Sequence, residues 1–131
     1  MDAAARHQAR ERALSLLYEA ELKGEDPMAV VADLPVAPDP FATTLVQGAQ
    51  AHRQQADALI ADASVGWPLD RMAVVDRLVL RLAVAELLDA DGPPVPVVID
   101  EAVELAKTYS TDDSGGFVNG ILSTVAAKVR V

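Results

Sequence analysis

The chain has 131 residues, eleven Lys and Arg against twenty Asp and Glu, and a formal net charge of −9 at pH 7. Hydrophobic residues make up 51% of it, which excludes a disordered acidic tail and suffices for one domain with an aliphatic core. The chain has no cysteine, so disulfides, thiolate metal sites and cysteine nucleophiles are excluded. Two histidines, His7 and His52, leave little for zinc binding or imidazole catalysis, and we expect neither a metal nor another cofactor.

No apolar run approaches the roughly 20 residues that cross a bilayer. The first twelve residues are polar and charged, without the apolar centre of a signal peptide. We therefore expect a cytoplasmic protein that does not associate with a membrane.

The charge is unevenly distributed along the sequence. Residues 1–12 carry three arginines against two acidic residues, a net charge of +1, and the remainder carries eight basic against eighteen acidic residues, a net charge of −10. An acidic protein repels nucleic acid, but a small basic end can still contact phosphates. Any functional interpretation has to account for both parts.

Helical periodicity dominates the first third of the chain. Residues 2–22 contain no Gly or Pro and carry apolar residues at three- and four-residue spacing, which predicts a helix that ends at Gly24. The pair Asp26-Pro27 is typical of a helix start and predicts a short helix through Leu34. Residues 35–40 include three prolines and are expected to be a connector.

The middle of the chain predicts two longer helices. The first covers residues 41–63, with a bend or a close helix contact at Gly48, and ends at residues 66–68. A single turn is expected at Asp70. Residues 72–88 form the most apolar segment and predict the central helix.

The last third predicts two more helices, over residues 96–109 and 114–128, with Ser114 as the N-cap of the second. No segment shows the alternation of a strand. The prediction is an all-α fold of about six helices in a single domain, residues 1–131.

Enzymatic activity is not expected. The sequence contains no glycine-rich phosphate loop and no metal-binding pattern. Asp100, Glu101 and Glu104 fall within one turn, but acids are common at helix starts, and Glu104 can pair with Lys107. Ser114 has no base near it in sequence, and N-capping accounts for it.

The start of the first helix is a candidate RNA surface. Arg6 and Arg10 lie one turn apart and are expected to be exposed, and Tyr18 follows two turns later. Guanidinium groups bind phosphates and a tyrosine ring can stack on a base. The alternative is a solvated, arginine-bearing helix start with a half-buried tyrosine.

Two further features allow more than one interpretation. Arg77 and Arg81 are spaced i, i+4 in the central helix, so their like charges repel unless something negative lies opposite. That group is either a bound anion or acids of a neighbouring helix such as Glu101 or Glu104, and we favour the acids.

The segment SGGFVNG, residues 114–120, is the second of these features. It places Phe117 at the start of a helix, partly exposed. Asn119 and Gly120 are expected to be a buried amide and a tight helix crossing.

Three segments and their spacing resemble the NusB family of bacterial transcription antitermination proteins over essentially the whole chain. They are ARHQARERALSLLYEAEL, VVDRLVLRLAVAELL and DEAVELAKTYSTDDSGGFVNGIL. The resemblance implies six to seven helices in two small bundles packed at an angle, and no catalysis. It implies binding of boxA-type single-stranded RNA from ribosomal RNA leader transcripts, together with the NusE-type small-subunit ribosomal protein. The complex would join RNA polymerase and suppress termination.

The resemblance also assigns residues. Arg6, Arg10, Tyr18 and Phe117 match RNA-contacting positions. Asp76 in VVDRLVLR and Asp113 in DDSGGFVNG match positions that face the protein partner.

Two departures from the family pattern reduce positive charge on the RNA surface. The arginine run of some members is interrupted by His7, Gln8 and Ala9, and Gly115-Gly116 replaces basic or His residues. We therefore expect RNA binding to depend on the basic partner. The alternatives are a helical adaptor that binds only protein, and a homodimer that covers its RNA surface. A ribosomal RNA methyltransferase with such a domain is excluded because this chain has no catalytic cysteine.

Overall fold

Seven α-helices and one 3₁₀ turn make up the fold, as a computed structural model that describes all 131 residues shows. In chain order they are α1 (Ala3–Lys23), α2 (Pro27–Ala32), α3 (Pro40–Ala51), α4 (Arg53–Ala63), η1 (Leu69–Arg71), α5 (Val74–Leu88), α6 (Val95–Tyr109) and α7 (Ser114–Val129).

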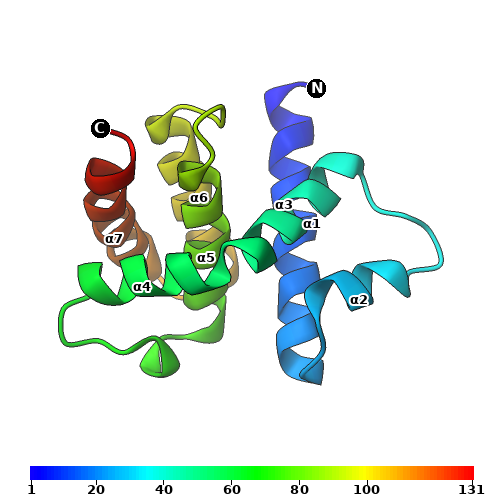
Figure 1. Cartoon of the computed structure of the whole chain (residues 1–131), viewed down its shortest axis with the longest axis horizontal. Helices are drawn as coiled ribbons and strands as arrows, with labels where there is room; N and C mark the ends of the chain where they lie inside the picture. Colours follow the sequence, from blue (N-terminus) through cyan, green and yellow to red (C-terminus); the bar gives the residue numbers. More distant parts are fainter.

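The helices form two bundles packed at an angle, α1–α3 in one and α4–α7 in the other (Figure 1). The predicted all-α fold is confirmed. No helix combines the length and the apolar character needed to cross a membrane.

Helix α1 begins and ends as its sequence predicts. The Asp2 carboxylate accepts a hydrogen bond from the Ala5 amide at 2.8 Å and caps the first turn. Gly24 adopts φ 65°, ψ 30°, a left-handed conformation that glycine takes without steric cost, and ends the helix. The apolar stripe is buried, which fixes which side of α1 faces solvent.

The predicted helix over residues 41–63 is interrupted at His52 and becomes α3 and α4. His52 has φ −101° and ψ 9°, outside the helical range, although its carbonyl still accepts from the Ala56 amide at 2.8 Å. Nothing lies within 4 Å of a Cβ placed on Gly48, so no close helix contact occurs there, and α3 continues past Gly48 to Ala51. The interruption lets α3 pack on α1 while α4 packs on α5 and α7, and the chain passes between bundles without a loop.

Helix α5 is the central element, as its apolar sequence predicts. It packs against helices of both bundles, namely α1, α3, α4, α6 and α7. Every residue from Leu78 to Leu87 is buried, including the charged side chains of Arg81 and Glu86. Such charges need partners, and those partners decide how the two bundles are joined.

The start of α7 differs from the prediction in its polar contacts. Asp113, not Ser114, is the N-cap, and it makes no capping bond through its side chain. The Ser114 hydroxyl points inward instead and donates to the Asp76 carboxylate at 3.0 Å.

Phe117 is partly exposed, as predicted, but the expectations for Asn119 and Gly120 were wrong. Asn119 and Gly120 are exposed. The close approach is at Gly115, where a Cβ would lie 2.7 Å from Cε of Lys107.

Candidate nucleic-acid and partner interface

Two arginines on α1 are exposed and take part in no ion pair. Arg6 donates to the Met1 carbonyl at 3.2 Å, and Arg12 donates to the Ser15 hydroxyl at 3.3 Å. Both guanidinium groups therefore keep donors free for an anion. The prediction that Arg6 is exposed is confirmed, and sequence reasoning had not selected Arg12 as a site residue.

Arg10 is not exposed, contrary to the prediction. Its side chain is 2% accessible and forms two hydrogen bonds with Glu86 of α5, from Nε at 3.1 Å and from Nη2 at 2.8 Å. The guanidinium carbon lies 5.6 Å from the centre of the Phe41 ring. Arg10 therefore lies on the core-facing side of α1, where it joins that helix to α5 and cannot reach a phosphate outside.

A second contact joins α1 to α6. Nδ1 of His7 lies 2.6 Å from the Glu101 carboxylate, and Arg10 Nη1 lies 3.8 Å from the same carboxylate. The hydrogen bond to Glu101 is the largest influence on His7 and raises its pKa above the ordinary 6.5, although burial works in the opposite direction. For Arg10, burial is the largest influence and opposes the charged form, but Glu86 and Glu101 outweigh it and raise the pKa. The acid at position 101 thus holds α1 in place, and no ion pair forms between Glu104 and Lys107.

The arginines of α5 pair with different acids from those expected. Arg77 binds Glu21 of α1 at 2.6 Å, and Arg81 binds Asp57 of α4 at 2.7 Å through Nε. Both therefore point away from the acids of α6. The periodicity of α5 could not reveal this, because the partners come from helices distant in sequence.

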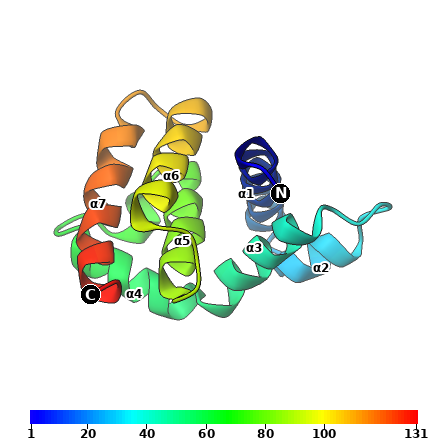
Figure 2. The ribbon, with the colours of Figure 1, turned by 90° about the horizontal axis from the view of Figure 1, so that it is seen from above.

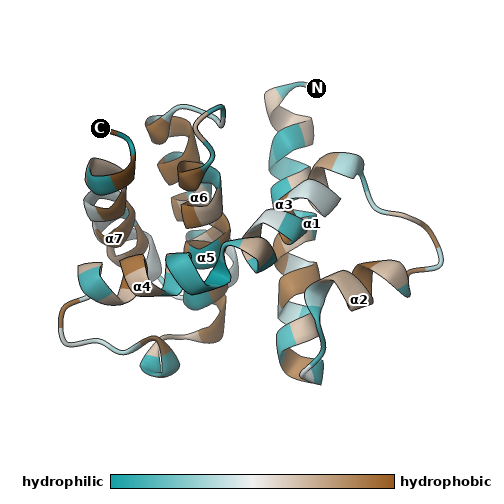
Figure 3. Ribbon diagram, viewed as in Figure 1, coloured by the Kyte–Doolittle hydropathy of each residue, from teal (hydrophilic) through white to brown (hydrophobic).

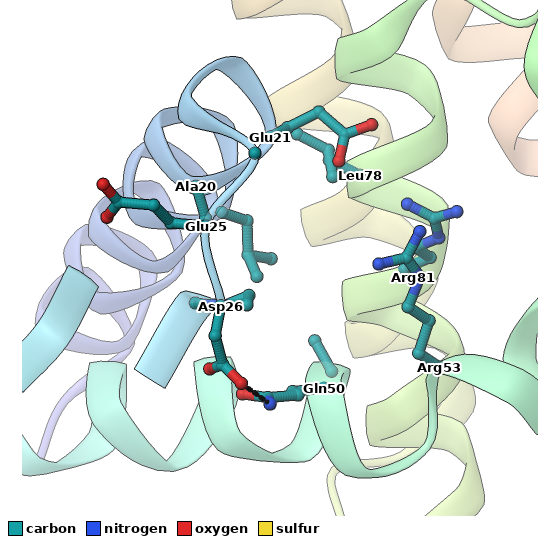
Figure 4. A pocket seen from close by; sticks show the side chains of 12 residues that line it. Ala20, Glu21, Glu25, Asp26, Gln50, Arg53, Leu78 and Arg81 are labelled. Carbon is teal, nitrogen blue, oxygen red and sulfur yellow. Dashed lines mark hydrogen bonds between the residues drawn. The ribbon is translucent and has the colours of Figure 1, made fainter. Parts of the chain in front are cut away.

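A cleft lined by charged residues lies where the two bundles meet (Figure 4). Its volume is about 410 Å³, with Glu21, Glu25 and Asp26 on one side and Arg53 and Arg81 on the other. Arg81 is already bound by Asp57 and the Asp26 carboxylate accepts from Gln50 at 2.7 Å. Each of these pairings lies within one bundle. The cleft residue that joins the bundles is Glu21 of α1, through its ion pair with Arg77 of α5.

Tyr18 is 39% exposed, so its ring is available as the RNA hypothesis requires. It lines a groove of about 290 Å³ with Tyr109 of α6, which is 48% exposed. The Tyr109 hydroxyl donates to the Glu11 carboxylate, and this hydrogen bond, followed by burial, raises the pKa of Tyr109. Tyr109 was missed in the sequence because nothing near it in the chain marks it as a neighbour of α1.

A second hollow brings together three of the predicted residues. Asp76, Asp113 and Phe117 line it with Ser114 and Trp67. The rings of Trp67 and Phe117 are 6.4 Å apart and tilted by 59°, and Trp67 is 55% exposed. Oδ1 of the buried Asp76 has no hydrogen-bond partner.

The arrangement is suited to a positively charged group. Carboxylate oxygens accept hydrogen bonds from Lys or Arg, and aromatic faces attract cations. Val75 lines the groove beside Tyr18 while Asp76 lines this hollow, so the two depressions lie on either side of the start of α5. Arg6 is part of neither.

Comparison with known proteins identifies the family. The sequence profile of the NusB family matches residues 7–127. The chain belongs to the NusB family. It is 48% identical over 128 residues to the transcription antitermination protein NusB of Saccharopolyspora erythraea, a match that covers 93% of this chain and 86% of the relative.

Solved structures of the NusB family have the same fold. NusB of T. maritima is 36% identical, with a TM-score of 0.85 over 94% of this chain and 91% of that one. A crystal structure of the antitermination factors NusB and NusE in complex with double-stranded RNA contains a chain 31% identical to this one, with a TM-score of 0.80 over 97% of this chain and 99% of that one. The resemblance seen in the sequence is confirmed.

Replacing Arg10 by Met should destabilise the protein by about 3–5 kcal/mol, because Glu86 is left buried without its partner. Replacing both residues, Arg10→Met with Glu86→Leu, should cost much less, since no uncompensated charge remains. Urea unfolding followed by circular dichroism measures both, with the exposed Arg6→Met as control. A single Arg10 variant as stable as the Arg6 control would contradict a structural role for the pair.

Protonated His7 should stabilise the folded protein through Glu101. Because the folded-state pKa is raised, this contribution is fully present below about pH 6.5 and is lost as the pH rises through the folded-state value. Wild type should therefore exceed His7→Gln in melting temperature most clearly at low pH, and the difference should shrink in mildly alkaline buffer. An NMR titration that gave His7 a pKa at or below its ordinary value would refute this.

Proposed function

We propose that this chain is a transcription antitermination factor that binds boxA-type single-stranded RNA of ribosomal RNA leader transcripts together with a NusE-type ribosomal protein. The observation that carries the proposal is the hollow in which Asp76, whose Oδ1 has no hydrogen-bond partner, lies beside Asp113, Trp67 and Phe117. It offers a basic protein partner a negative site, next to rings on which bases can stack. Family membership, and the solved complex of a relative with NusE and double-stranded RNA, support a NusE-type partner and an RNA ligand.

The proposed RNA surface consists of Arg6 and Tyr18 on α1 and Phe117 on α7. Arg6 is exposed without an ion-pair partner, Tyr18 has an accessible ring, and Phe117 is half-buried beside exposed Trp67. Arg10 has a positioning role in this proposal: by holding α1 on α5 it sets where Arg6 and Tyr18 lie. A single exposed arginine gives few phosphate contacts, so the partner has to supply much of the positive charge.

Three further parts complete the proposal, two that rest on family membership and one that rests on the packing of the core. The complex joins RNA polymerase in the cytoplasm, where nascent ribosomal RNA is made, and the chain has no enzymatic role. Residues 1–131 act as one domain, since a single hydrophobic cluster includes residues of both bundles. The alternatives are a protein-only adaptor and a homodimer in which α1 is covered. Sedimentation of the free protein separates them, because only the homodimer would be twice the mass of one chain.

Titration of labelled boxA RNA, with and without the NusE-type partner and over a range of salt concentrations, tests the main proposal. We expect tighter binding with the partner, a steep loss of affinity with salt, and weaker binding of a duplex of the same sequence. Arg6→Ala should reduce the salt slope by about 1, whereas Phe117→Ala should weaken binding at every salt concentration. Equal affinity with and without the partner would overturn the cooperative mechanism.

Asp76→Asn tests the partner site with little change in shape. The amide oxygen can still accept from Ser114, but an NH₂ group replaces the carboxylate oxygen that has no partner. We expect partner affinity to fall at least about tenfold, as for a buried charge pair that loses one member. Asp100→Asn, at an exposed position in the second turn of α6, is the control and should leave affinity unchanged. Calorimetry measures both, and equal affinities would exclude Asp76 from the interface.

A further inference from the structure

The groove between α1 and the end of α6 is lined mostly by aromatic and apolar side chains. The aromatic ones are the exposed rings of Tyr18 and Tyr109, and the apolar ones are Leu14 and the half-buried Val75. The groove takes its residues from α1, from the start of α5 and from the end of α6, and Figure 2 shows how these three helices are arranged. Its volume of about 290 Å³ lies just below the range for small-ligand sites, about 300–1,000 Å³. A flat aromatic ring suits such walls, whereas an RNA helix is too large to enter.

One end of the groove carries a carboxylate with unused acceptor capacity. Oε2 of Glu11 accepts the Tyr109 hydroxyl, but Oε1 lies 3.8 Å from Nε2 of His7, beyond hydrogen-bonding distance. A carboxylate accepts from the exocyclic amino group of adenine, cytosine or guanine. Uracil has no such group, so Glu11 would discriminate against it.

The other requirement for a nucleotide, a cation for its phosphate, is met by Arg12. Its guanidinium donates to Ser15, a residue that lines the groove, and takes part in no ion pair. Arg12 is exposed and has further donors free. The Arg12 guanidinium thus lies beside a groove with an apolar and aromatic interior. A nucleotide requires this combination, because its base is flat and apolar on its faces and its phosphate is negatively charged.

We propose that this groove is a binding site for one unstacked nucleobase that carries an exocyclic amino group, held between Tyr18 and Tyr109, read by Glu11 and anchored through its phosphate by Arg12. The inference rests on the proposed RNA-binding function and extends it, since Tyr109, Glu11 and Arg12 belong to none of the residues assigned above. Single-stranded RNA is commonly recognised by such splayed-out bases.

Fluorescence anisotropy with the intact protein and its NusE-type partner tests the site. The probes are a fluorescein-labelled single-stranded RNA containing all four bases and an oligouridine of the same length. We expect Tyr109→Ala to weaken binding of the mixed RNA at least about fivefold, as for the loss of one stacked base. Tyr109→Phe, which keeps the ring, should retain most of the affinity. Glu11→Gln should reduce the preference for the mixed RNA over oligouridine.

Arg12→Ala should lower the salt slope by about 1, whereas Arg53→Ala, an exposed arginine of α4, should leave it unchanged. Circular dichroism confirms that each variant is folded. If wild type binds RNA and Arg6→Ala weakens it, but the Tyr109 and Glu11 variants bind as wild type does, the base site is refuted and the proposed function stands. If wild type binds neither RNA, both are refuted. Loss of partner binding with Tyr109→Ala would assign the groove to the protein partner and also overturn the inference.

Discussion

The buried ion pair between Arg10 and Glu86 is the interaction on which the rest of the molecule depends. It joins α1, which carries the exposed arginines, to the central helix α5. The two residues are 76 positions apart in the chain. Two hydrogen bonds and a contact with the Phe41 ring satisfy the guanidinium. Because both charges are withdrawn from water, α1 cannot rotate about its axis without leaving a charge unpaired. That constraint keeps Arg6, Arg12 and Tyr18 toward solvent.

The remaining polar contacts between elements follow the same logic. Arg77 and Arg81 extend from α5 to Glu21 of α1 and Asp57 of α4, and His7 extends from α1 to Glu101 of α6. An apolar interface would hold the helices together as well, but ion pairs at fixed positions also set their rotation. Several of the acids that give the net charge of −9 are therefore already paired with basic side chains within the protein. Among the acids outside these ion pairs are Asp76 and Asp113, which line the hollow that we propose as the partner site.

Much of the fold could be predicted from local sequence signals, since periodicity, Asp N-caps, Gly24 and the prolines fix helix boundaries within a residue or two. The interruption at His52 could not, because it arises from two packing environments that meet there. Likewise, the exposure of Arg10 was misjudged because a charged residue on a helix's first turns is usually solvated, and Glu86 is distant in sequence. The hollow of Asp76, Asp113 and Phe117 was accessible only through family resemblance. Neither the local sequence nor the family resemblance indicated a role for Tyr109.

A single hydrophobic cluster runs through both bundles, from Ala13 on α1 to Ala126 on α7. Neither bundle therefore has a complete core of its own, and unfolding of either one would expose the apolar face of the other to water. The loss of structure is consequently cooperative across the whole chain, without a stable half-folded intermediate. This has a consequence for the two surfaces proposed above. The hollow of Asp76 and Asp113 cannot persist in a molecule in which α1, with Arg6 and Tyr18, has unfolded.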